Sequence, residues 1–221
     1  MNMEMSVPRI DLAQGQTSDG ATEQFDPALS LFQAVRAVSD ESLHAHEFHV
    51  GRLAQTLATL MNMNSALCHQ IGHAAGLHDI GKFAIPSRVL GKEGKLNAEE
   101  LEEIKRHCEH GATILERSGR SRDSLEIQVA LYHHERWDGS GYSSGLEGED
   151  IPIAARITAL ADVYDALRAK RPYKPALTHE DVVDIIVNGD GRTHPGHFDP
   201  NVLATFKENH LEFEAVWREQ V

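Results

Sequence analysis

Histidines and aspartates recur in this chain at intervals that suit a metal centre. Several stand in short runs, LHDIGK and HHERWDG, and each interval between runs is close to one helix plus one connection. A buried imidazole beside a buried carboxylate is costly unless the two are paired or bind a cation. In an antiparallel helical bundle, one ligand from each helix can reach a shared point. The candidate ligands are His49, His78, Asp79, His107, His133, His134 and Asp162.

The number of these side chains indicates two metal ions. Five imidazoles and two carboxylates exceed the three or four protein ligands of one tetrahedral zinc. They suit two divalent ions that share a bridging carboxylate and a water. Nitrogen and oxygen ligands without thiolate favour iron, manganese, nickel or zinc over copper(I) or calcium, and we expect iron or manganese first. Any one histidine taken alone is more often a satisfied core residue, but the His-Asp and His-His pairs favour metal binding for the set.

Helices must position these ligands, because apolar residues recur with helical spacing and no useful alternating strand pattern occurs. Val50, Leu53 and Leu57 define one buried stripe, and a second stripe ends at His78. Asn97 with Glu100 predicts a capped helix that runs to about residue 117. Further helix starts are expected at Asp26-Pro27, Pro152, Thr178 and Asp199-Pro200. The predicted fold class is an all-α, single-domain helical bundle.

Length and composition narrow the class of protein. A chain of 221 residues suffices for one substantial domain, which we expect at 26–221 behind a disordered tail at 1–25. A net charge of −13 argues against binding a nucleic acid polymer. No apolar run is long enough to span a membrane. Cys68 and Cys108 stand apart, so we expect neither a disulfide nor a thiolate cage, and a cytoplasmic location.

These motifs together resemble the HD-GYP domain, a branch of the HD superfamily of metal-dependent phosphohydrolases. The stretches HVGRLA, LHDIGKFAIP, HHERWDGSGY, IPIAARITALADVYDAL, RPYK and FDP run in the family's order, together with His107 and Gly111 as H-x-x-x-G. The resemblance covers about residues 30–206. It implies an all-helical fold and hydrolysis of cyclic-di-GMP to pGpG, and often on to GMP, by a hydroxide held between the metals.

The resemblance also implies roles for single residues. Asp79 would bridge the two metals, and Lys82 would meet the scissile phosphate, so these two are the expected catalytic residues. Arg171 and Lys174 match positions that contact the second phosphate. Gly141 and Tyr142 are the Gly-Tyr pair from which the family takes part of its name, and we call the segment around them the Gly-Tyr loop. The expected substrate contacts are Gly141, Tyr142, Asp165, Arg171 and Lys174.

Two positions depart from the family pattern. Members with three metals carry a glutamate four residues before the first histidine ligand, and Ala45 stands four residues before His49. Two metals are therefore expected. Ser143 stands where the family's name calls for proline, and serine leaves this turn freer because proline would fix φ near −65°.

Other functions fit the same residues. A non-catalytic module could sense cyclic-di-GMP, or dock a GGDEF-type diguanylate cyclase domain through the Gly-Tyr loop. An HD phosphohydrolase could act on another cyclic dinucleotide or on a nucleotide. The complete ligand set and Lys82 favour catalysis. The sequence leaves the metal identity, the final product and the formation of a homodimer open.

Overall fold

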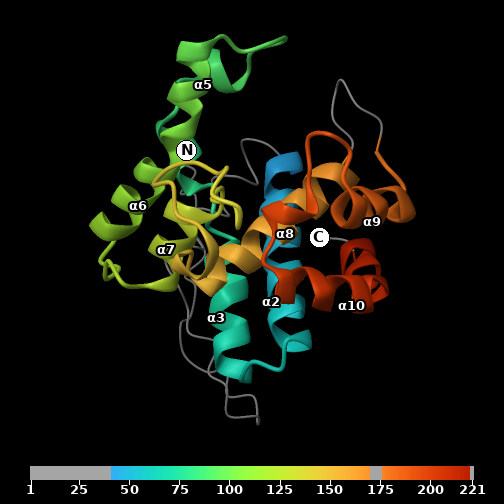
Figure 1. Ribbon diagram of the computed structural model, residues 1–221. Coiled ribbons are helices and arrows are strands. Elements are labelled where there is room, and N and C mark those ends of the chain that lie inside the picture. The colour runs from blue at the N-terminus through green and yellow to red at the C-terminus, as the bar shows by residue number, and fades with distance from the viewer. Residues whose placement is uncertain (1–40, 170–175, 220–221) are drawn as a thin grey trace, which may run out of the picture.

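The regular elements of this computed structural model are all helices in the residues that it describes, 41–169 and 176–219 (Figure 1). This confirms the all-α prediction. The expected tail and the start at Asp26-Pro27 lie outside the described residues. The helices are α2 (Glu41–Leu60), α3 (Ser65–Ala75), η1 (Ile80–Ala84), α4 (Ser87–Leu90), α5 (Ala98–Lys105), α6 (His107–Arg117), α7 (Leu125–Tyr132), η2 (Gly148–Asp150), α8 (Ile153–Arg168), α9 (His179–Asn188), η3 (Pro195–His197) and α10 (Pro200–Arg218).

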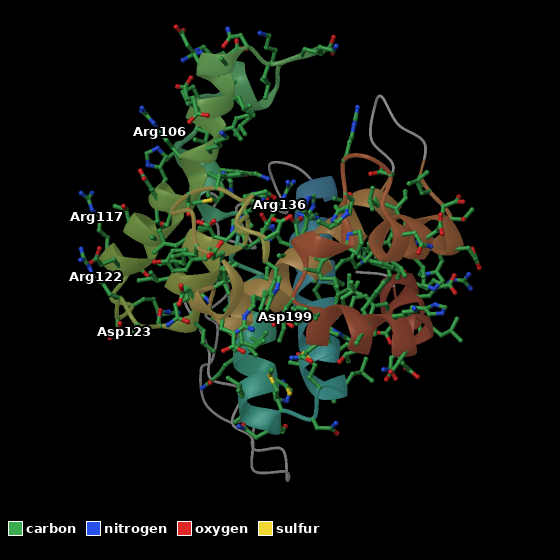
Figure 2. All side chains as sticks on the ribbon, in the orientation of Figure 1. Arg106, Arg117, Arg122, Asp123, Arg136 and Asp199 are labelled. Atoms are coloured by element: carbon green, nitrogen blue, oxygen red, sulfur yellow. The ribbon has the colours of Figure 1, made fainter. Side chains whose placement is uncertain are left out.

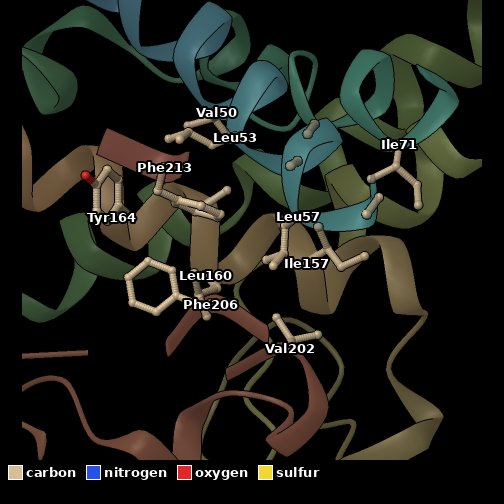
Figure 3. Close-up of a cluster of buried hydrophobic side chains, with 14 of the residues drawn as sticks. Val50, Leu53, Leu57, Ile71, Ile157, Leu160, Tyr164, Val202, Phe206 and Phe213 are labelled. Atoms are coloured by element: carbon tan, nitrogen blue, oxygen red, sulfur yellow. The ribbon is translucent and has the colours of Figure 1, made fainter. Parts of the chain in front are cut away.

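The main core forms where α2, α3, α8 and α10 pack together (Figure 3). The predicted stripe of α2 is buried, and each of its residues Val50, Leu53 and Leu57 has no exposed surface. Residues of α8 and α10 face it, among them Ile157 and Phe206. Removing this much apolar surface from water stabilises the helices against one another and holds one face of α2 against α8.

A second, smaller core joins η1, α6 and α7 through Leu77, Ile80, Leu115, Ile127 and Ala130. Here the backbones approach closely. A Cβ at Gly81 would lie 1.9 Å from the carbonyl oxygen of His107, so only glycine lets η1 lie against the start of α6. This contact brings the segment after Asp79 next to the first residue of α6.

Several helix starts are confirmed. Asn97 and Glu100 form the predicted capping box, while Thr178 and Asp199 accept hydrogen bonds from the first backbone N–H groups of α9 and α10. Pro152 is the residue before α8.

Two helix boundaries differ from the prediction. The helix expected from Asn97 to residue 117 is interrupted at Arg106, which is exposed on the outside of the molecule (Figure 2). As a result α5 projects from the body while α6 packs within it (Figure 1). The helix expected to include His78 ends at Ala75, and the chain turns before η1. Both breaks place a histidine at a helix end, where backbone carbonyls lack helical partners.

Candidate metal centre

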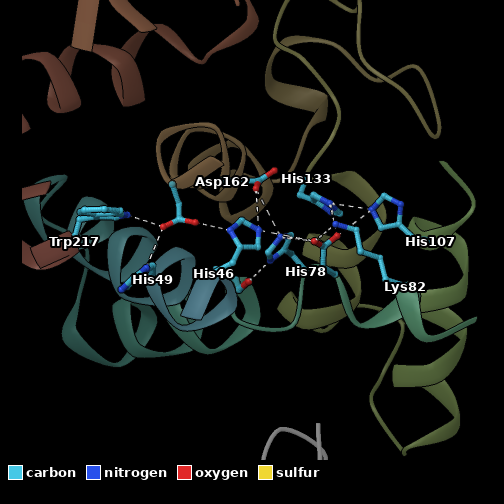
Figure 4. Close-up of polar contacts among 11 residues, drawn as sticks. His46, His49, His78, Lys82, His107, His133, Asp162 and Trp217 are labelled. Carbon is cyan, nitrogen blue, oxygen red and sulfur yellow. Dashed lines mark hydrogen bonds and ion pairs between the residues drawn. The ribbon is translucent and has the colours of Figure 1, made fainter. Parts of the chain in front are cut away.

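Two groups of side chains lie together, and they share Asp79; Figure 4 shows several of their members side by side, among them His46, His78 and His133. In one group, Asp79, His107, His133 and His134 each offer a ligand atom within 4.8 Å of the others. In the other group, His46, His78 and Asp79 do the same. A carboxylate common to two ligand groups is the arrangement expected of a bridge between two metal ions.

Asp162 extends the second group. It comes from the middle of α8, and its Oδ1 lies 3.3 Å from His46 Nε2 and 3.9 Å from His78 Nε2. The two groups therefore contain four side chains each, with Asp79 counted in both. Four is the number of ligands that a tetrahedral site takes.

Backbone carbonyls orient three of the imidazoles. His78, His107 and His133 each place Nδ1 at hydrogen-bond distance from a carbonyl oxygen three or four residues earlier, at 2.8, 2.7 and 2.9 Å. A carbonyl can only accept, so each Nδ1 carries the proton and donates. In the neutral imidazole this leaves Nε2 unprotonated and facing the cluster, as metal-binding histidines require. The acceptors are Ala75, Ile104 and Val129.

His46, rather than the predicted His49, lies beside the other candidate ligands. His46 Nδ1 lies 2.6 Å from Asp165 Oδ2, and its Nε2 faces Asp162. His49 turns aside: its Nδ1 lies 3.2 Å from Asp165 Oδ1, and its ring is next to Trp217. The physical reason is tertiary packing. His46 lies four residues before Val50 and His49 four residues before Leu53, so spacing along the stripe favours both, and only the packing of α2 against α8 brings His46 to Asp162.

Asp165 was expected to contact substrate, and the structure places it behind the cluster instead. It is buried, with 1% of its surface exposed. Its two oxygens contact His46, His49 and the Trp217 indole N–H. Burial would raise the pKa of Asp165, but these partners hold it below the usual value. An ionised carboxylate behind a histidine orients the ring and raises its basicity.

Lys82 reaches the cluster as predicted, but from η1 rather than from a continuing α-helix. Its ammonium contacts Asp79 Oδ2. Burial would raise the pKa of Asp79, whereas Lys82 and His78 hold it well below the usual value. The Asp79 carboxylate is therefore ionised, with a cationic side chain beside it.

The Gly-Tyr loop closes over one side of the cluster. The Tyr142 ring stacks on the His134 ring with centroids 4.7 Å apart, and the backbone N–H of Tyr142 donates to the His134 carbonyl. A Cβ at Gly141 would lie 2.4 Å from the backbone nitrogen of Arg136, so glycine is required for this path. Tyr142 therefore lies at the cluster, and Gly141 packs against the backbone of Glu135 and Arg136. Arg171 and Lys174 lie outside the described residues.

Ser143 is tied into this loop rather than free. Its backbone adopts φ +127°, and its hydroxyl donates to the Leu131 carbonyl at 2.6 Å. The buried carboxylate of Glu135 accepts the N–H groups of Ser144 and Gly145 at 2.6 and 3.0 Å. Proline cannot adopt this φ, so the loop follows a path that the family's proline could not take.

Hydrogen bonding and charge in the cluster fit a divalent metal. His78 Nε2 and Asp79 Oδ1 are buried and make no hydrogen bond within the described part of the chain, which is unfavourable unless a cation lies beside them. Burial lowers the pKa of His133 and brings that of His134 to about 4, so both rings keep a lone pair at neutral pH. Asp162 stays ionised, because His46 and His78 lower its pKa against the effect of burial.

Comparison with known proteins gives the family. Residues 30–202 match the family model described as "HD domain". The chain is 42% identical over 187 residues to "3'3'-cGAMP-specific phosphodiesterase 2" of Vibrio cholerae, covering 85% of this chain and 35% of that protein. It is 38% identical over 192 residues to "Cyclic di-GMP phosphodiesterase" of Thermotoga maritima, covering 87% and 51%. The chain thus spans about half of these relatives or less.

Solved structures share the fold. "Bd1817, a HDG"Y"P protein from Bdellovibrio bacteriovorus" aligns with a TM-score of 0.60 at 20% identity, over 84% of this chain and 60% of that one. The HD domain of L. monocytogenes phosphodiesterase PgpH in complex with cyclic-di-AMP aligns with a TM-score of 0.57 at 17% identity, over 86% and 99%. Fold and site define an all-helical protein with a histidine-aspartate centre. The chain belongs to the HD domain family, in its HD-GYP branch.

Proposed function

We propose that this domain is a metal-dependent phosphodiesterase that opens cyclic-di-GMP to pGpG, with GMP as the alternative end product. The observation that best supports this proposal is the position of Asp79. Its carboxylate belongs to both groups of candidate ligands, and the Lys82 ammonium lies beside it. Relatives named as cyclic di-GMP phosphodiesterases support this substrate.

We propose that the ligands are His46, His78, Asp79, His107, His133, His134 and Asp162, holding two divalent ions. Iron or manganese suits this nitrogen and oxygen set best, with nickel or zinc as alternatives. A third ion is not expected: with His46 as the first histidine, the residue four positions earlier is Ser42, which offers no carboxylate. The correction from His49 thus leaves the expected number of ions at two.

Bound divalent cations would polarise the phosphodiester and lower the pKa of a water to near neutrality. Side chains of the protein would stabilise the developing charge and contact the substrate. Lys82 lies beside the bridging carboxylate and can stabilise negative charge on the phosphoryl oxygens. Tyr142, whose ring stacks on His134, lies beside the cluster and would contact the substrate there. Water adds to phosphorus, the bond to the ribose O3′ breaks, and that oxygen takes a proton.

A second candidate substrate is 3′3′-cGAMP. The observation that favours it is the 42% identity to a phosphodiesterase of that specificity. The two dinucleotides differ in one base and share the phosphodiester groups that the metals would polarise. Specificity between them would therefore come from residues that contact the bases rather than from the metal ligands.

The test is a turnover panel with protein reconstituted with Mn²⁺ or, anaerobically, with Fe²⁺. Cyclic-di-GMP, 3′3′-cGAMP, cyclic-di-AMP and a linear dinucleotide are compared, and an Asp79→Asn variant is the matched control. Turnover of cyclic-di-GMP at least tenfold faster than of 3′3′-cGAMP supports the proposal. Faster turnover of 3′3′-cGAMP than of cyclic-di-GMP would make 3′3′-cGAMP the substrate instead. Tight binding without turnover at full metal occupancy indicates a sensor, and elemental analysis near three metals per chain overturns the two-metal assignment.

We also propose a cytoplasmic protein that binds a GGDEF-type cyclase domain through the Gly-Tyr loop. Ser143, Ser144 and Gly145 are exposed at the loop's outer edge, which supports docking there. In the described part of the chain no helix is long and apolar enough to cross a membrane. Sedimentation with and without a purified cyclase domain tests both docking and a homodimer; a lone monomer in both samples rejects them.

A further inference from the structure

The C-terminal helix reaches the metal centre through a chain of hydrogen bonds. The indole N–H of Trp217 donates to Asp165 Oδ1 at 2.7 Å. The other oxygen of Asp165 lies 2.6 Å from His46 Nδ1, and His46 Nε2 faces Asp162 and Asp79 at 3.3 and 3.9 Å. Figure 4 shows this line from Trp217 at one side to the histidine cluster at the other.

The shape of α10 brings Trp217 to this position. The helix is broken at Asn209, where φ is −126°, so its second half takes a new direction. Phe213, one turn before Trp217, is fully buried in the main core and anchors that half. Residues four apart share a helix face, so Trp217 lies on the same inner face. The Arg168 guanidinium packs over its ring at 4.4 Å.

Asp165 depends on this indole for its position. The carboxylate is 1% exposed and has little access to water, so its orientation is set by the side chains around it. Oδ1 of Asp165 contacts the Trp217 N–H at 2.7 Å and His49 Nδ1 at 3.2 Å. The contact with the indole is the shorter of the two. Without it, Asp165 would keep one strong contact, to His46, and could rotate with that ring.

We propose that Trp217 is a positioning residue of the metal centre: it holds Asp165, which holds His46 with Nε2 toward the metal. Helix α10 is thereby coupled to metal affinity. The coupling is reciprocal, so metal binding must also change the surroundings of Trp217. This inference rests on the metal centre of the proposed function and not on its substrate.

A Trp217→Phe variant separates positioning from packing. Phenylalanine keeps an aromatic ring against Arg168 and in the core but lacks the N–H. Loss of a partner behind a metal ligand weakens metal affinity about 10- to 100-fold, and we expect about tenfold because Trp217 acts through Asp165. Trp137→Phe is the matched control, since Trp137 packs on Arg156, whereas the described polar contacts of the Asp165 carboxylate are with His46, His49 and Trp217.

The measurement is calorimetric titration of metal-free protein with Mn²⁺, alongside thermal unfolding of each metal-free variant. Trp217→Phe should bind about tenfold more weakly, and Trp137→Phe should match the wild type. In an Asp165→Asn background, Trp217→Phe should add less than about twofold, because the chain is already broken. Equal Mn²⁺ affinity of wild type and Trp217→Phe overturns the inference, as does a full tenfold effect in the Asp165→Asn background.

Fluorescence supplies an independent readout. Trp137 and Trp217 are the two tryptophans of the chain, so Trp137→Phe leaves Trp217 as the sole reporter. Zn²⁺, which does not quench by paramagnetism, should shift its emission and saturate at the calorimetric dissociation constant. No change at saturating Zn²⁺ overturns the coupling. Wild-type protein that binds no metal refutes the centre itself, whereas normal Trp217-dependent binding without cyclic-di-GMP turnover rejects only the proposed substrate.

Discussion

Replacing Ser143 by the family's proline should disrupt the Gly-Tyr loop. Ser143 has φ +127°, whereas the proline ring fixes φ near −65°. The backbone would have to rotate by about 170° at this residue. Such a rotation cannot preserve the hydroxyl bond to Leu131 or the two N–H groups that Glu135 accepts from Ser144 and Gly145.

The magnitude follows from these contacts. The hydroxyl bond contributes about 0.5–1.5 kcal/mol, and each N–H bond to the carboxylate about 1.5–3 kcal/mol. A non-glycine residue at positive φ already stores about 1–3 kcal/mol of strain. Ser143→Pro releases the strain but loses all three bonds, a net loss of about 3 kcal/mol. Ser143→Ala keeps the strain and loses one bond, about 1 kcal/mol, and Ser143→Gly loses that bond but relieves the strain, which leaves stability near the wild type.

Urea unfolding of the metal-free protein tests this order, with a fixed m-value as the check for two-state behaviour. The expected order of stability is wild type and Ser143→Gly, then Ser143→Ala, then Ser143→Pro. Because Tyr142 precedes this residue and stacks on His134, Ser143→Pro should also raise KM for cyclic-di-GMP. Equal free energies of unfolding for the proline variant and the wild type would refute the reasoning from backbone conformation.

Three further predictions concern the cluster. His46→Ala should lower bound metal to about half, because it removes a ligand of one group only, while His49→Ala should keep the stoichiometry with about tenfold weaker affinity; elemental analysis and titration measure both. Gly81→Ala should destabilise the protein by about 3 kcal/mol, since its Cβ would meet the His107 carbonyl at 1.9 Å. Burial raises the pKa of Cys108 to about 12, so its thiol stays protonated below that pH. Iodoacetamide at pH 8 should therefore modify it only on unfolding, as mass spectrometry of native and urea-treated protein would show.

Each of these has a contrary outcome. Equal metal loss in His46→Ala and His49→Ala would return His49 to the ligand set. A Gly81→Ala protein as stable as the wild type would show that η1 and α6 can separate without cost. Fast alkylation of Cys108 in native protein would show that solvent and reagent reach this buried thiol without unfolding.

Much of the metal centre was determined by the sequence alone. His78 with Asp79 and His133 with His134 stand as adjacent pairs, and local chemistry marks them without knowledge of the fold. Asn97, Thr178 and Asp199 likewise start helices through hydrogen bonds to their own neighbours. Such features depend on contacts within a few residues, which spacing predicts well.

Tertiary structure decided which histidine of α2 faces the metal. His46 and His49 lie three residues apart, and both come close to Asp165. Only the packing of α2 against α8 shows that His46 continues the buried stripe and meets Asp162. The position of Asp165 behind the ligands, and its bond to Trp217, depends on residues more than 50 positions apart in the chain. Spacing within one helix cannot reveal such partners, because they are brought together by the burial of apolar faces rather than by local propensity.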